Sequence, residues 1–97
     1  MTENKPERLD LGHGVSITFT TWESHNPVGL VEYHNRPDGS PCVGGGILFD
    51  LPGVSEAFPD RPVWTLENLD PLTISPSLQC MSCSHHGFIR DGRWVPA

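Results

Sequence analysis

Glycine and proline recur so often in this chain that only short secondary-structure elements fit between them. The 97 residues include ten glycines and ten prolines, and both residue types interrupt helices and shape turns. The densest group lies at residues 35–41, which read NRPDGSP. The chain is therefore predicted to form an all-β domain, small and rich in turns, with almost no helix.

Alternating side chains mark the first predicted strand. Residues 15–22 alternate apolar and hydroxyl-bearing side chains, which is typical of a half-buried strand, so Val15, Ile17 and Phe19 would share its core face. The dipeptide Asp91-Gly92 suits a two-residue hairpin turn. Five to seven short strands are expected in all, the others at residues 28–34, 43–50, 62–66, 72–75, 87–90 and 93–95, with at most one helical turn, at 54–58.

Two further features of the strand regions have structural explanations. Three successive glycines, Gly44 to Gly46, permit positive φ angles and close backbone approach, so a β-bulge is expected there. A phosphate-binding loop is disfavoured because no Gly-Lys-Ser/Thr motif follows these glycines. Trp22, Trp64 and Trp94 are expected in or near the core of a small β domain rather than on a binding surface.

The length of the chain allows one domain with one small core. Residues 1–10 are polar and contain Pro6, which predicts a flexible N-terminal arm, and residues 11–97 are predicted to form the single domain. No apolar stretch of about eighteen residues suggests a membrane span, and the first residues lack the apolar run of a secretory signal. A cytoplasmic location without membrane contact is therefore expected.

Acidic residues outnumber basic ones. Twelve Asp and Glu residues against six Lys and Arg residues give a formal net charge of −6. Nucleic acids are bound mainly through Lys and Arg, so nucleic acid is an unlikely partner for this chain. A protein partner, especially a basic one, or a small ligand agrees better with the charge.

A cluster of cysteines and histidines near the C-terminus predicts a metal site. Cys80 and Cys83 have a spacing that lets both thiolates reach one tetrahedral ion at about 2.3 Å. His86 follows three positions after Cys83, and Cys42 comes at the end of the turn-rich run at 35–41. An odd number of cysteines without an export signal argues against a disulfide framework. We therefore predict a structural Zn²⁺ site with Cys42, Cys80, Cys83 and His86 as ligands.

Several alternatives to this ligand set remain open. His34 ends the second predicted strand just before the turn-rich run and is the alternate fourth ligand. His85 would point away from His86 on an extended segment, so only one of the two is expected to bind the ion. A catalytic metal with an open coordination position, a redox pair, or a Cys83 nucleophile assisted by a histidine is less favoured. A structural ion would tie residues 37–41 to the C-terminal hairpin and supply stability that the small core lacks.

The C-terminal third also carries a recognisable pattern. It consists of Pro-Ser-Leu at 76–78, the two cysteines at 80 and 83, His-Gly-Phe-Ile at 86–89 and Gly-Arg-Trp at 92–94. This pattern resembles that of a group of small uncharacterised zinc-knuckle proteins of actinobacteria and their phages, and the segment from Tyr33 to Gly44 also looks similar. The resemblance implies a compact metal-binding domain and carries no known activity.

These observations together favour a non-enzymatic function. The expected protein is a phage-type interaction module that contacts a host factor or a virion component, in the host cytoplasm or in the virion. A zinc-dependent enzyme of the hydrolase type, with water at an open metal position, is the first alternative. A structural component of a phage particle is the second.

Overall fold

The computed structural model describes residues 8–22 and 26–97 and confirms the predicted all-β fold. Within these residues eight strands and one short helix follow in the order β1 (Leu9–Gly12), β2 (Val15–Thr21), β3 (Pro27–Asn35), β4 (Pro41–Phe49), α1 (Val54–Ala57), β5 (Val63–Leu69), β6 (Leu72–Gln79), β7 (His86–Arg90) and β8 (Arg93–Pro96). In the described ranges no helix is long and apolar enough to cross a membrane.

The strand that sequence patterning did not predict is β1. Residues 1–7 of the predicted arm lie outside the described residues, whereas Leu9 and Asp10 belong to β1 and pair with β2. The turn between the two strands uses three residues with positive φ, Gly12, His13 and Gly14, and the side chain of Asp10 accepts a hydrogen bond from the Gly12 amide at 2.9 Å. The tight turn therefore adds a four-residue strand to the sheet and buries its Leu11 in the core.

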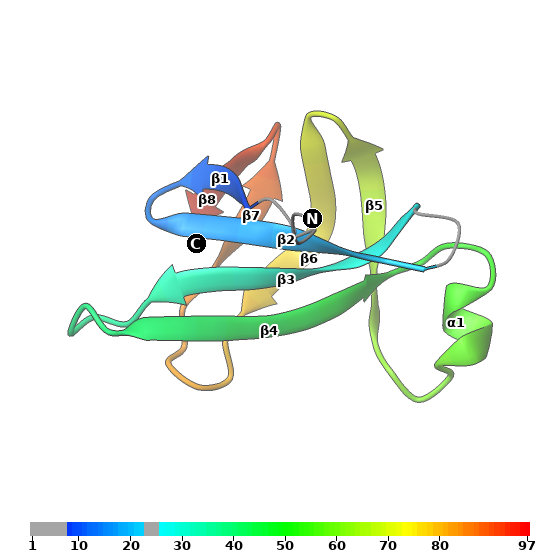
Figure 1. Cartoon of the computed structure of the whole chain (residues 1–97), viewed down its shortest axis with the longest axis horizontal. Coiled ribbons are helices and arrows are strands. Elements are labelled where there is room, and N and C mark those ends of the chain that lie inside the picture. The colour runs from blue at the N-terminus through cyan, green and yellow to red at the C-terminus, as the bar shows by residue number, and fades with distance from the viewer. Residues whose placement is uncertain (1–7, 23–25) are drawn as a thin grey trace, which may run out of the picture.

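Each strand pairs with the next one along the chain, from β1 to β8. All pairs are antiparallel except β4 and β5, which run parallel and pair only at Leu48 with Val63 and Phe49 with Trp64. Figure 1 shows β2, β3 and β4 running across the view, with β5 and β6 nearly perpendicular to them. Since β1 and β8 also lie against each other, the sheet is nearly closed.

The core lies between these strands. Val15 and Ile17 are fully buried and Phe19 packs against the same cluster, as the alternation in the sequence predicted. Trp94 is a core residue and Trp64 packs against the core, whereas Trp22 is exposed. The main cluster comprises Leu11, Val15, Ile17, Leu30, Ile47, Phe49, Leu72, Ile74, Leu78, Ile89 and Trp94.

The glycine run forms the predicted bulge in β4. The pairing of β3 with β4 shifts register between Glu32 with Gly45 and Tyr33 with Val43, which leaves Gly44 as the extra residue. Gly45 adopts a φ of 105°, and a Cβ on Gly44 would collide with the carboxylate of Glu32. The three glycines thus allow β4 to bend around the buried carboxylate of Glu32.

Candidate active site and metal centre

Four residues from two distant parts of the chain converge on one point. They are His34, Cys42, Cys80 and Cys83, whose ligand atoms lie within 4.8 Å of one another. The sulfur of Cys42 is 3.8 Å from those of both Cys80 and Cys83, and His34 Nε2 is 3.0 Å from the Cys83 sulfur. This cluster could hold a metal ion.

The spacing of the sulfurs matches that of a tetrahedral metal site. Four ligands at zinc–sulfur distances of about 2.3 Å from a common centre would place their sulfurs about 3.8 Å apart. The two Cys42 distances have this value. The Cys42 sulfur is therefore at the separation from the other two sulfurs that one tetrahedral ion requires.

Secondary structure brings these ligands together in pairs. His34 and Cys42 are directly opposite each other at the ends of β3 and β4. Cys80 and Cys83 lie in the turn between β6 and β7, where the Cys80 amide bonds to the His85 carbonyl at 2.7 Å and the Ser84 amide bonds to the Cys80 carbonyl at 2.9 Å. An ion bound here would join the β3–β4 hairpin to the β6–β7 turn.

The pKa values of the thiols show how closely the sulfurs interact, and such an interaction favours a bound cation. Burial and hydrogen bonds to the other two cysteines raise the pKa of Cys42 to about 11. Burial opposes ionisation of Cys80 as well, but the backbone amides of Cys83 and Ser82 and the neighbouring thiols outweigh it and lower the pKa of Cys80 to about 7. Among sulfurs this close, one thiolate disfavours the next, and a divalent cation would remove that repulsion.

A buried carboxylate orients the histidine of this cluster. Glu32 Oε2 is 2.6 Å from His34 Nδ1, and both side chains are almost completely buried. Because the carboxylate pairs with Nδ1, Nε2 is the ring nitrogen left to face the sulfurs. Glu32 was missed by sequence reasoning, although its position two residues before His34 on a strand puts both side chains on one face.

The same atoms have a second chemical interpretation. Cys83, His34 and Glu32 form a chain of nucleophile, base and orienting carboxylate, which is the arrangement of a cysteine hydrolase. Two further thiols, those of Cys42 and Cys80, lie within 4.8 Å of these ligand atoms. A nucleophile needs neither of them and a metal ion uses both, so the metal interpretation accounts for more of the geometry.

His85 and His86 take different positions from each other. The ring of His85 lies between those of His34, at 4.0 Å, and Trp94, at 4.9 Å, and is nearly parallel to both. Burial, followed by the charge of His34, lowers the pKa of His85. Its Nδ1 is buried without a hydrogen-bond partner among the described residues. His86 is exposed and lies outside the four-residue cluster, which contains the alternate candidate His34 instead.

His86 is instead paired with a serine. Its Nε2 lies 2.8 Å from the hydroxyl oxygen of Ser77 on the neighbouring strand β6. When Nε2 is unprotonated, it accepts the hydroxyl proton, which is how a histidine activates a serine nucleophile. Ser77 was missed as a functional residue, because only its place in the Pro-Ser-Leu stretch of the family resemblance drew attention to it.

An irregularity in β6 presents Ser77 to His86. Ile74 pairs with Ile89 and Leu78 pairs with Gly87, so the three β6 residues between them face Phe88 alone. Such bulges re-aim side chains and are frequent beside active sites. The carbonyl of Ser77 also accepts a hydrogen bond from the indole of Trp64 at 3.1 Å, which holds this part of the backbone in place.

Comparison with known proteins identifies one family. The family described as "Bacterial ubiquitination-like system serine protease (BubE)" matches residues 41–97, more than half of the chain. No curated protein and no solved structure matches the chain. The matched segment contains Ser77 and His86, together with Cys42, Cys80 and Cys83.

This match corrects the function expected from the sequence. A non-enzymatic phage-type interaction module was expected, whereas the family is described as a protease and therefore points to an enzyme-related role. The expectation was wrong because it was based on the cysteine cluster, which indicates a metal site. A single serine in a strand has no sequence spacing that identifies it as a nucleophile.

Proposed function

The chain belongs to the BubE family, and from this premise we propose that it is a serine protease of a bacterial ubiquitination-like system. We assign Ser77 as its nucleophile and His86 as its general base. The observation that carries the assignment is the 2.8 Å contact between Ser77 Oγ and His86 Nε2, which lies inside the segment that matches the family. A peptide or isopeptide bond of a protein substrate is the expected target.

The proposed reaction follows from this pair. Ser77 Oγ attacks the scissile carbonyl carbon while His86 Nε2 takes the hydroxyl proton, and His86 then returns that proton to the leaving amine. Water next attacks the resulting ester on Ser77 and loses a proton to His86. The ester bond breaks, the carboxylic acid product leaves, and His86 returns the proton to Ser77 Oγ. Among the described residues no carboxylate is hydrogen-bonded to His86, so the pair acts as a dyad.

We propose Zn²⁺ as the ion of the four-residue cluster, with a structural role. Three sulfurs and one imidazole nitrogen are the ligand set that zinc prefers, and four protein ligands fill a tetrahedral site. The set comprises His34, Cys42, Cys80 and Cys83, with Glu32 supporting the histidine. Because Cys83 is only three residues from His86, an ion here would also hold the start of β7 in place.

Labelling with a fluorophosphonate probe tests the assignment of the nucleophile. Such probes react with activated serines, so the protein should be labelled once, with the modification mapped to Ser77 by mass spectrometry. Ser77→Ala should abolish labelling. Ser55→Ala is the matched control, because Ser55 lies on α1, in the same matched segment but outside the site. Labelling of Ser77→Ala at the rate of the unaltered protein would refute the assignment.

Glu32→Gln is expected to weaken zinc binding by about 10- to 100-fold without unfolding the domain. The glutamine keeps the shape of the side chain but no longer accepts the Nδ1 proton as an anion, which reduces the basicity of the liganding nitrogen. Competition with a chromophoric chelator measures the affinity. Glu56→Gln, on the exposed end of α1, is the control. Equal zinc affinity in Glu32→Gln and the unaltered protein would contradict the proposed role.

A further inference from the structure

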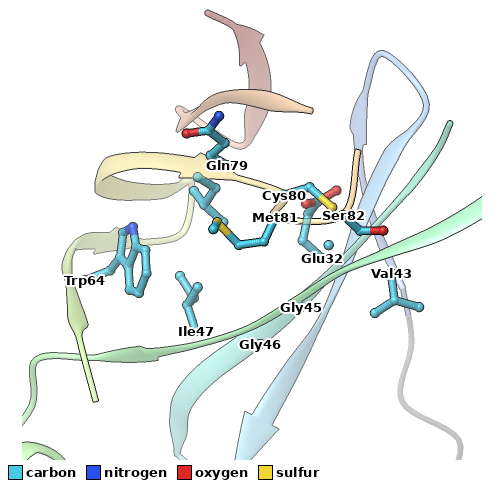
Figure 2. Close-up of a pocket in the computed structure, with 12 residues that line it drawn as sticks. Glu32, Val43, Gly45, Gly46, Ile47, Trp64, Gln79, Cys80, Met81 and Ser82 are labelled. Atoms are coloured by element: carbon cyan, nitrogen blue, oxygen red, sulfur yellow. The ribbon is translucent and has the colours of Figure 1, made fainter. Parts of the chain in front are cut away.

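We propose that the groove beside the free edge of β4 binds the protein substrate as an extended peptide strand, an inference that rests on the proposed protease function. The groove has a volume of about 430 Å³. Figure 2 shows β4 with Gly45 and Gly46 along one side, Trp64 and Ile47 at one end, and Met81 across the middle.

The wall formed by β4 has unused hydrogen-bonding capacity. One edge of β4 pairs with β3 from Pro41 to Leu48, but the other pairs with β5 only at Leu48 and Phe49. In the described part of the chain no strand pairs with the second edge at residues 41–47. Unpaired strand edges accept an added strand through backbone hydrogen bonds. The glycines at 44–46 leave this edge without side chains, so a second backbone can approach closely.

The groove also offers an apolar contact surface. Ile47, Trp64 and Leu78 line it, and Met81 extends over it from the turn after β6. Met81 is 94% exposed, and a flexible exposed methionine is an adaptable contact for apolar ligands. In an added strand every second side chain would face this surface. An aliphatic residue at those positions would gain the most from binding.

The groove lies next to the strand that carries the proposed nucleophile. Leu78 and Gln79 line it and directly follow Ser77 in β6. Trp64, which lines the groove, donates its indole N–H to the Ser77 carbonyl. A strand bound along β4 would therefore pass close to the backbone of Ser77, which lies just outside the groove lining. The net charge of −6 and the presence of Glu32 in the groove wall disfavour acidic residues in that strand.

The substrate segment inferred from these features is an extended strand with alternating aliphatic and neutral or basic residues. The probe for a test is an acetylated heptapeptide in which leucine alternates with threonine. It is added to ¹⁵N-labelled, zinc-loaded Ser77→Ala protein, which cannot cleave it. The amide resonances of residues 43–47 and the indole resonance of Trp64 should shift together as the peptide is added.

Two kinds of control distinguish strand addition from non-specific hydrophobic binding. A peptide with the same side chains but N-methylated at alternate residues cannot donate the ladder hydrogen bonds and should bind at least about tenfold more weakly. Met81→Asp should weaken binding of the original probe by a similar factor. Leu69→Asp, at an exposed leucine outside the groove, should leave it unchanged.

The outcomes distinguish this inference from the proposed function. Shifts elsewhere on the domain, no shifts at millimolar peptide, or equal binding of the N-methylated probe would overturn the groove assignment, even if fluorophosphonate labels Ser77. If the probe binds at residues 43–47 but Ser77 is never labelled, the peptide site stands and the serine protease assignment falls.

Discussion

Replacing His86 with alanine is expected to lower kcat/KM by at least about a hundredfold while leaving bound zinc unchanged. General-base assistance contributes about 10²- to 10⁴-fold, and the His86 imidazole, 2.8 Å from Ser77 Oγ, is the proposed base. The ring is exposed and lies outside the metal cluster, so its loss should affect neither metal content nor stability. Cleavage of a fluorogenic peptide gives the rate, and elemental analysis of the same sample gives the zinc content.

The reciprocal variant is His34→Ala. It removes a proposed metal ligand and leaves the carboxylate of Glu32 buried without its partner, so zinc and stability should both fall. The two histidines are therefore expected to show opposite patterns, one losing rate and the other losing metal. If His86→Ala lost zinc and His34→Ala retained it, the ligand set first favoured by the sequence would be correct and the present assignment of both residues would be wrong.

Removing the metal is expected to unfold the domain or leave it only marginally folded. Structural zinc in small domains contributes about 10–16 kcal/mol of apparent binding free energy. Even a loss of about 3 kcal/mol would lower Tm by about 12–24 °C in a chain of this size. Thermal melting followed by circular dichroism, before and after exhaustive chelation at neutral pH, measures the change.

Cys42→Ser tests the same point without a chelator. Cys42 comes from β4, whereas Cys80 and Cys83 belong to the β6–β7 turn. Loss of the Cys42 thiol should therefore weaken the link that the ion makes between the β3–β4 hairpin and this turn. Both zinc and Tm should drop. A melting temperature unchanged by both chelation and Cys42→Ser would show that the ion, if bound, is not structural.

The fold was largely predictable because its signals are local. Alternation at residues 15–21 and the turn formers around residues 35–41 each act within a few residues, and the structure confirms the strands they imply. The missed strand, β1, spans only four residues, Leu-Asp-Leu-Gly, which are too few to show a clear alternation, and the turn at Gly12 to Gly14 places it against β2. The local sequence pattern does not predict that tertiary pairing.

The site was predictable only in part, for a related reason. The spacing of Cys80 and Cys83 places two ligands on one turn whatever the rest of the fold does. Whether His34 or His86 joins them depends on how the β3–β4 hairpin meets that turn, which no spacing encodes. The pairing of Ser77 with His86 depends on a register shift between β6 and β7, and such a shift has no simple sequence pattern.

The division of the proposed metal ligands along the chain has a consequence for biosynthesis. His34 and Cys42 lie on one hairpin, and Cys80 and Cys83 lie about forty residues later, although every strand pairs with its sequence neighbour. A growing chain can add strands in order as they leave the ribosome, but it cannot complete the metal site until the β6–β7 turn has emerged. Ser77 and His86 flank that turn, so metal loading and assembly of the dyad become possible at nearly the same moment of synthesis. The proposed dyad of the nascent polypeptide therefore cannot form until the chain has been made as far as His86.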